Sequence, residues 1–186
     1  MSELQPSVYA ASVLRGLVVA ALSNAVTAGT LTATIYSPGD TSTAAEQLPA
    51  VLVRSARQRK RQLTRGQFLY TSVVEIELQA QLEARTAPAA QDQIELMGQQ
   101  IEAVFFTDPG LLGVIQAYPE INQQVRIASD GNQHNAELDM SWAIEVTERF
   151  WPVPGTPIAA VQADTQAPDP EGAVAPVGFE VRPGAA

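Results

Sequence analysis

The stretch from Phe68 to Leu82 constrains the fold of this chain more than any other segment. Apolar residues occupy every second position, interrupted only by Ser72, and the positions between them carry Glu75, Glu77 and two glutamines. Side chains of a β-strand alternate between the two faces of a sheet, so this period of two is typical of a strand with one face in water. The sequence therefore predicts one long, amphipathic β-strand here.

The preceding segment LPAVLVRSARQ, residues 48–58, predicts a second strand, with Pro49 at its beginning, where a missing N–H does least harm. A basic cluster lies between the two strands and holds six of the eleven basic residues in a chain of formal charge −9. The cluster consists of Arg54, Arg57, Arg59, Lys60, Arg61 and Arg65. We therefore predict a long antiparallel hairpin with a charged, irregular tip.

Two interpretations of the basic cluster stay open. A solvated tip would use its charges to keep strand ends from pairing with other molecules. Alternatively, the cluster contacts an acidic partner surface or nucleic acid. Because the total charge is −9, the chain without this +6 carries −15, so the tip of one copy and the body of another are complementary. Such copies would associate head to tail in a ring. Reversing Arg57, Arg59, Lys60 and Arg61 to Glu is expected to leave the fold intact, since a solvated tip carries little packing.

The remaining pattern predicts two longer helices, a helical turn and three more strands. The expected helices cover residues 8–25, ended by Gly29, and 87–106, with a helical turn over 108–121. The expected strands cover residues 30–36, 121–131 and 135–151, the last two joined at Asp130-Gly131. The fold class is α+β, a mostly antiparallel sheet with a long β-hairpin, flanked by two or three helices, in a domain of residues 1–151.

Residues 152–186 differ in composition and hold seven of the thirteen prolines. We expect an extended, Pro-rich C-terminal arm that becomes ordered by contacting another chain. The segment IAAVQAD is the candidate for adding a strand to a neighbour's sheet edge. Trp151, at the boundary, either caps the edge of the core or anchors the subunit on another one.

Motifs for catalysis and for cofactors are missing. The chain has no cysteine, one histidine, no Gly-rich phosphate loop and no zinc or calcium signature. Asp130, Asn132, His134 and Asp139 suggest a metal site, but Asp-Gly also predicts a hairpin turn with polar residues, including His134, in an exposed loop. We predict no catalytic, cofactor or metal site and a protein that is not an enzyme.

Three other classes are disfavoured by particular residues. Glu75 and Glu77 are the candidate acid/base pair of an enzyme, yet they lie on the water-facing side of a strand. An acidic pI near 4.5 disfavours a general nucleic-acid binder, although Phe68 and Tyr70 lie next to the basic cluster. No apolar run reaches the roughly 18 residues of a spanning helix, so no membrane contact is predicted.

The order of elements resembles that of the tail terminator proteins of long-tailed bacteriophages, also called minor tail or tail completion proteins. The segments that carry the resemblance are LRGLVVAAL, LPAVLVR, FLYTSVVEIELQAQ, IELMGQQIEAVF and NAELDMSWAIEV, within residues 8–151. The resemblance implies a hexameric ring that caps the tail tube, stops its growth and joins the tail to the neck or head connector. Implied partners are further copies of the chain, the tail tube protein, a neck or head-completion protein and a sheath protein, with DNA only as the transiting genome. The implied location is the virion, at the tail–neck junction, and the host cytoplasm during assembly.

Alternatives remain open beside this resemblance. Another neck or adaptor ring, or a tube protein, would also use a helix-flanked sheet with long loops. A tube protein polymerises alone, whereas a terminator stays soluble until it meets a tube end. An enzyme would need a concave pocket around Glu75 and Glu77.

Overall fold

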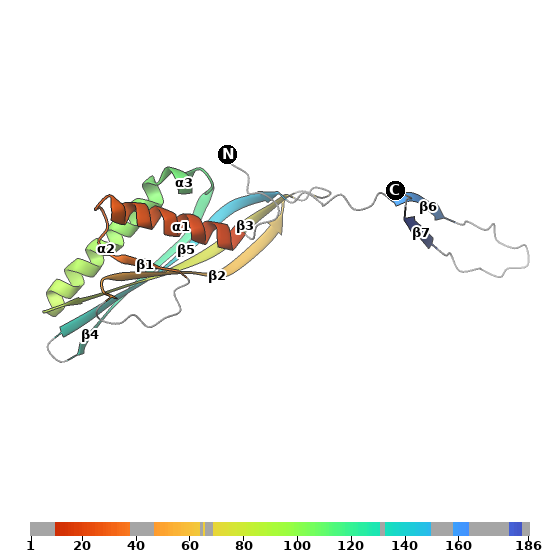
Figure 1. The fold of residues 1–186 in the computed structure, drawn as a ribbon. Helices are drawn as coiled ribbons and strands as arrows, with labels where there is room; N and C mark the ends of the chain where they lie inside the picture. Colours follow the sequence, from red (N-terminus) through yellow and green to blue (C-terminus); the bar gives the residue numbers. More distant parts are fainter. Residues whose placement is uncertain are drawn as a thin grey trace, which may run out of the picture. The chain divides into compact units, whose positions relative to one another are not determined.

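The structure is a computed structural model, shown in Figure 1. It describes residues 10–37, 47–63, 65, 69–130, 133–149, 158–163 and 179–183. The chain divides into two compact units, Met1–Phe150 and Trp151–Ala186, where the sequence predicted a boundary after residue 151.

The first unit is built on a five-stranded sheet in the order β1-β2-β3-β5-β4. The strands are β1 (Thr34–Tyr36), β2 (Ala50–Gln62), β3 (Leu69–Ala84), β4 (Ala117–Asp130) and β5 (Gln133–Arg149). All neighbouring strands are antiparallel except β1, which pairs with β2 in parallel. The predicted α+β fold with a mostly antiparallel sheet and a long β2–β3 hairpin is confirmed.

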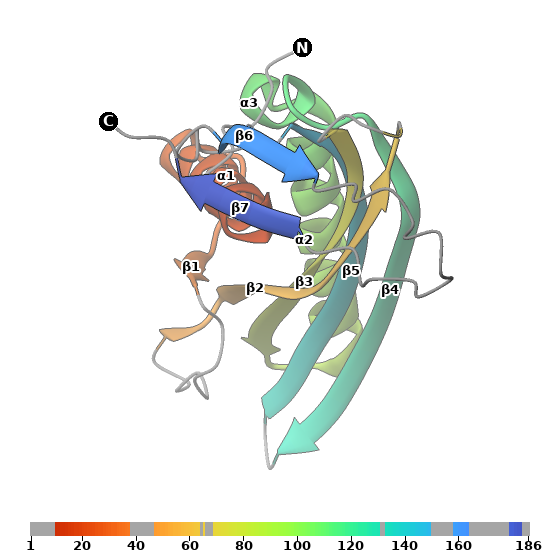
Figure 2. The same ribbon diagram turned by 90° about the vertical axis from the view of Figure 1, so that its right-hand side faces the viewer.

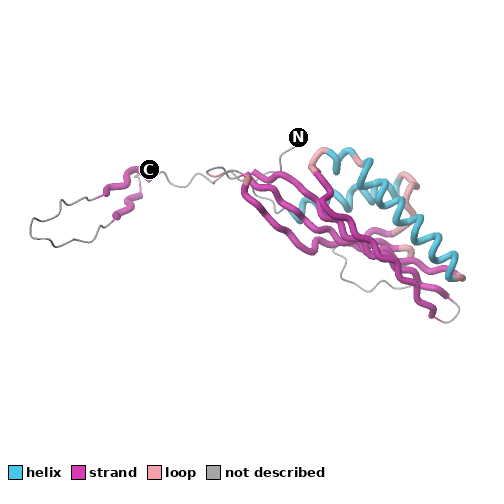
Figure 3. The backbone as a smooth tube through the Cα atoms, turned by 180° about the vertical axis from the view of Figure 1, so that it is seen from behind, coloured by secondary structure: helices cyan, strands magenta, loops and turns pink. Residues whose placement is uncertain are grey.

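Three helices cover one face of this sheet and leave the other face open (Figures 2 and 3). They are α1 (Ala10–Thr27), α2 (Ala87–Thr107) and the single turn α3 (Pro109–Leu112). The Thr86 hydroxyl caps α2 by accepting from the Ala89 N–H, and Pro88 occupies the first turn, where no N–H is needed. Gly29, with φ of +73°, follows α1, as the sequence predicted.

The core lies between the helices and the alternate residues of β3 and β5. The predicted dry face of β3 is buried from Val74 to Leu82, and the equivalent positions of β5 are buried from Ala136 to Val146. Trp142 of β5 stacks on Phe105 of α2 with ring centroids 4.2 Å apart. Ser72 is also fully buried, although it interrupts the apolar pattern.

Helix α1 corrects the expectation that no segment is long and apolar enough to span a membrane. With 18 residues and a mean hydropathy of 1.5 it is, by length and composition, apolar enough to cross a membrane. In the structure Leu14, Val18 and Leu22 of α1 are fully buried in the core of the first unit. In the first unit, α1 therefore packs as a core helix, and its apolar side chains contribute to the core.

Strand β4 begins earlier than expected. The sequence predicted a helical turn through residue 121, but α3 ends at Leu112 and β4 starts at Ala117. The β4–β5 register shifts between Ala117 and Glu120, around Pro119, which cannot donate to a ladder.

In the second unit the structure describes two strands, β6 (Ile158–Ala163) and β7 (Phe179–Pro183). They pair with each other in antiparallel register and form a two-stranded ribbon. The segment IAAVQAD was predicted as a strand for a neighbouring sheet, but its pairing with β7 was not. Trp151 lies outside the described residues.

Candidate functional site

The basic cluster is not an irregular tip, so that expectation is wrong. Arg54, Arg57, Arg59, Lys60 and Arg61 all lie within β2, which is paired with β3 through Gln62. Among the six cations only Arg65, an exposed residue, belongs to the connection between β2 and β3.

A β-bulge at Ala56 decides which way these cations face. Before the bulge, Val51 and Val53 face the core and are fully buried. The register then shifts, with Ser55 opposite one residue of β3 and Arg57 opposite the next, so Ala56 is an extra residue. Such a residue reverses the face alternation of everything that follows it in the strand. After the bulge, Arg57, Arg59 and Arg61 therefore face the open side of the sheet.

On the helix-covered side, the bulge places Gln58 and Lys60 above a buried carboxylate. The Lys60 ammonium lies 2.6 Å from Glu148 Oε2, and Gln58 Nε2 donates to Glu148 Oε1 at 2.8 Å. The Glu148 side chain is only 5% exposed, against 30% for Lys60. The nearby buried Ser72 hydroxyl has no hydrogen-bond partner in the part of the chain that the structure describes. Lys60 is thus a structural group, distinct from the arginines beside it.

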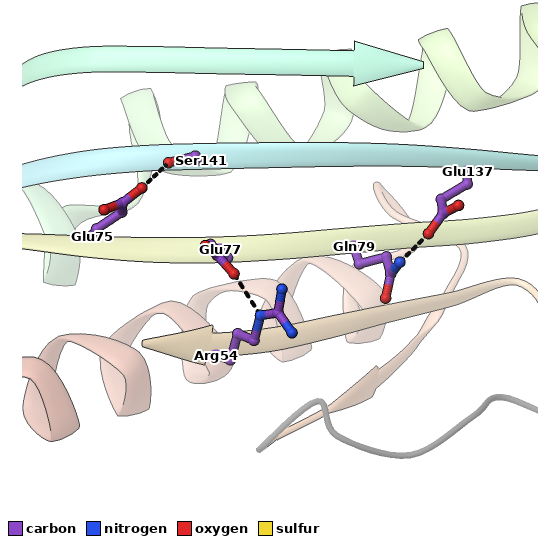
Figure 4. A network of polar contacts seen from close by, with 6 residues as sticks. All are labelled: Arg54, Glu75, Glu77, Gln79, Glu137 and Ser141. Carbon is purple, nitrogen blue, oxygen red and sulfur yellow. Dashed lines mark hydrogen bonds and ion pairs between the residues drawn. The ribbon is translucent and has the colours of Figure 1, made fainter. Parts of the chain in front are cut away.

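On the open face, polar residues of neighbouring strands form a cross-strand ladder (Figure 4). Arg54 Nε lies 2.5 Å from Glu77 Oε2, and Ser141 Oγ donates to Glu75 Oε1 at 2.9 Å. Gln79 bonds Glu137 one step further along. Glu75 and Glu77, the candidate acid/base pair, are therefore members of this ladder.

The ladder continues to the far edge of the sheet. Arg126 of β4 reaches Asp139 at 3.0 Å and Glu137 at 3.8 Å. These contacts line a shallow cleft of about 540 Å³ on the open face. Carboxylates predominate across β3, β5 and β4 on this face, at Glu75, Glu77, Glu83, Glu120, Glu137, Asp139 and Glu145, against Arg126 and Arg149.

Three arginines at the β2 edge of the open face form no ion pair with the residues that the structure describes. They are Arg57, Arg59 and Arg61, and all three are exposed. Arg57 and Arg59 line a second cleft, of about 400 Å³, together with Glu75 and Glu120. The open face is therefore bipolar, with free positive charge at one edge and carboxylates across the rest.

Of the suspected metal residues, His134 and Asp139 have described side chains, and each of these contacts another partner. His134 lies in β5, half-buried, with Nδ1 3.0 Å from Ser129 Oγ, and not in an exposed loop as expected. Asp139 is engaged by Arg126, and Asn132 lies outside the described residues. The described residues contain no group of three or more His, Asp or Glu side chains that could hold a metal ion.

An aromatic cluster beside the β4 edge was not predicted. Phe105, Phe106, Tyr118 and Trp142 contact one another with ring centroids between 4.2 and 6.3 Å apart. The Tyr118 hydroxyl donates to the Phe105 carbonyl at 2.7 Å, and burial raises the pKa of Tyr118 to about 12. The helical spacing of apolar residues around Phe105 does not predict this contact, because Tyr118 belongs to β4.

No family model matches the chain, and no curated protein matches it with significant similarity.

Proposed function

We propose that this protein is a structural subunit of a phage tail. Copies form a ring, in the hexameric form that the resemblance implies, which caps the tail tube, ends its growth and joins it to the neck or head connector. The order of helix, short strand, long hairpin, helix and second hairpin supports the proposal, since this order carries the resemblance.

The bipolar open face is the observation that carries the proposal. Even paired, exposed charges contribute only about 0 to 1 kcal/mol to folding. Stability therefore does not account for exposed arginines at positions 57, 59 and 61, which form no ion pair with a described residue. Association does, because complementary potentials speed encounter and fix register. Arg57, Arg59 and Arg61 of one copy would meet the carboxylates of the next, and repetition of that contact closes a ring.

The same surface favours protein over DNA as the partner of the arginines. Glu75 and Glu120 lie in the same cleft as Arg57 and Arg59, so this surface is not the continuous basic face that nucleic-acid binding requires. A tight arginine ring around the genome would also hinder its passage. The tube rim, a neighbouring subunit and the neck protein are therefore the proposed partners, at the tail–neck junction of the virion.

The test neutralises the three arginines and leaves Lys60 untouched. Changing Arg57, Arg59 and Arg61 to Gln alters the net charge by −3 at exposed positions of β2. Reversing Lys60 as well, as the sequence first suggested, would place a carboxylate against the buried Glu148 and confound assembly with unfolding.

A matched control carries the same charge change elsewhere. Ser23→Glu, Gln93→Glu and Gln99→Glu also alter the charge by −3, at exposed positions of the two long helices. Each purified protein is imaged by electron microscopy, first alone and then mixed with tail tubes of the phage to which it belongs. Wild type and control should show rings alone or caps at the tube ends. The triple Gln variant should show neither, and high salt should weaken the wild-type contact. Normal caps from the triple Gln variant would refute the proposed contact, and long tubes of wild type alone would favour a tube protein.

A further inference from the structure

Strand β4 presents an open edge in the part of the first unit that the structure describes (Figure 2). It is the last strand of the sheet, and its outer edge pairs with no described strand. Ile121 and Val125 lie opposite buried residues of β5, so they face the helices, yet they are 36% and 38% exposed. Glu120 and Arg126 are exposed on the open face. Unpaired backbone groups beside exposed apolar side chains are a template for a further strand.

This edge is complementary to itself in one antiparallel register. In a pair of copies related by a two-fold axis at Gln123, each residue lies opposite the one at equal distance on the other side of Gln123. Ile121 of one copy then lies opposite Val125 of the other, on the helix-facing side. Glu120 lies opposite Arg126, on the open face. Because the contact is isologous, each of these two pairs occurs twice.

The neighbouring registers lack this match. With the axis one residue later, Gln123 lies opposite Val125, and with the axis one residue earlier, Gln123 lies opposite Ile121. Both registers place an amide against an apolar side chain, and both separate Glu120 from Arg126. A register is specified where the side chains of the two faces agree on it. Here the apolar pair and the charged pair select the same one.

Glu120 and Arg126 can form this pair without losing their contacts within the subunit. Glu120 Oε1 accepts from Asn122 Nδ2 at 3.0 Å, and the carboxylate has a second oxygen. Arg126 Nη1 lies 3.0 Å from Asp139, while the Arg126 side chain is 56% exposed. A guanidinium has five N–H donors, so one ion pair does not exhaust it. Charge complementarity across the edge therefore adds to the ladder of the open face.

The second open edge in the described residues belongs to β2 and matches β4 less well. Strand β1 pairs with β2 only from Ala50 to Leu52, so the rest of that edge has no described partner strand. After the bulge, the helix-facing side of β2 carries Gln58 and Lys60 above Glu148. These polar groups would lie against the two apolar residues of β4. A second β4 covers them with apolar side chains instead.

We propose that two copies of this chain pair through their β4 edges, in the register centred on Gln123. The two sheets join into one continuous sheet with the helices of both copies on the same side. Main-chain hydrogen bonds along the edge hold the pair, and the side-chain pairs fix its register. A two-fold contact closes at two copies, so this pairing is independent of the head-to-tail ring.

A single cysteine tests the register, because the chain has no cysteine of its own. Gln123→Cys places the thiols of two paired copies directly opposite each other, with Cβ atoms about 5 Å apart. Ala128→Cys, at another exposed position of β4, places them ten positions apart along the strand, or about 33 Å. Copies with two different tags are co-expressed and treated with a short bis-maleimide. The two tags should become linked through Gln123→Cys and not through Ala128→Cys.

The triple Gln variant separates the pairing from the ring, since it keeps β4 and loses the arginine contact. Sedimentation equilibrium of this variant should show dimers. Adding Val125→Glu should raise the Kd of the dimer by about tenfold or more, because the carboxylate would face Ile121 of the other copy. The matched control Leu96→Glu, at a 53% exposed position of α2, should change the Kd by less than about twofold.

Each outcome decides between the two proposals or against the pairing. Dimers of wild type and of the triple Gln variant, linked through Gln123→Cys but without rings or caps, would uphold the pairing and refute the proposed function. Monomers of the triple Gln variant at every concentration would overturn the pairing and leave the ring untouched. Dimers that link equally well through Ala128→Cys, or that tolerate Val125→Glu as they do Leu96→Glu, would use another surface and would also overturn it.

Discussion

Replacing Lys60 by methionine should destabilise the isolated subunit by about 2–3 kcal/mol. The variant keeps an unbranched side chain one atom shorter but removes the ammonium 2.6 Å from Glu148, leaving Gln58 as the donor to that carboxylate. Breaking a buried ion pair from one side costs about 3–5 kcal/mol, because the remaining charge is desolvated and uncompensated. The Lys60 side chain is 30% exposed, so water reaches part of the vacated space and the expected cost lies at or just below the lower end of this range.

Urea denaturation and thermal melting measure this cost. For a chain of this size a loss of 2–3 kcal/mol lowers Tm by roughly 4–12 °C, with an unchanged m-value. The double variant Lys60→Met/Glu148→Leu removes both charges and should recover most of the loss. Arg61→Met, one residue away on the opposite face, should stay within about 0.5 kcal/mol of wild type. If Lys60→Met matches that control, or the double variant is no better than the single one, then Glu148 does not depend on Lys60 and the assignment of faces is wrong.

Three further outcomes follow from the packing. Deleting Ala56 removes the bulge and should abolish the native near-UV circular dichroism, whereas Ala56→Ser should not; a native spectrum from the deletion would contradict the bulge. Gly98→Ala brings a Cβ within 2.9 Å of Leu138 Cδ2 and should lower the free energy of unfolding by about 1 kcal/mol, as overpacking exceeds the gain in helix propensity. Gly16→Ala, with nothing within 4 Å, should raise it by up to about 1 kcal/mol, so equal urea midpoints for the two variants would refute this packing. Because burial raises the pKa of Tyr118 to about 12 from 10.0, the unfolded chain loses this proton first. Stability should therefore fall as pH rises from about 10 to 12, and a Tyr118→Phe variant with the same pH slope as wild type would count against it.

The long periodic segments were predictable because burial of one face leaves a repeating signal. The dry face of β3 and the apolar stripe of α2 both appear in the sequence at the spacing that the structure uses. The start of β4 was missed because AYPEI contains a proline and a polar residue where alternation should begin. Strand β7 was missed because FEVRP is short and lies in a Pro-rich context that favours an extended arm.

The bulge at Ala56 had no detectable signal, since no apolar residue from Arg57 to Gln62 marks which side of the strand faces the core. Polar strands specify register weakly, and only the paired strand shows where the extra residue lies. After the bulge, Lys60 faces the helices because it forms an ion pair with the buried Glu148. These two residues are 88 positions apart in the sequence. Binary patterning of apolar and polar residues does not record such a pair.

The bulge residue Ala56 affects both the stability of the subunit and its proposed association with other copies. Without Ala56, the alternation of β2 would place Lys60 on the open face and point Arg57, Arg59 and Arg61 towards the helices. The same insertion therefore supplies Glu148 with its counterion and places three arginines on the open face, where we propose that they meet a partner. Changes in strand length at this point alter both properties together, whereas substitutions of the three arginines alter association alone. This separation makes the arginine variants a clean test of assembly, because their folded subunits should melt like wild type while failing to form rings.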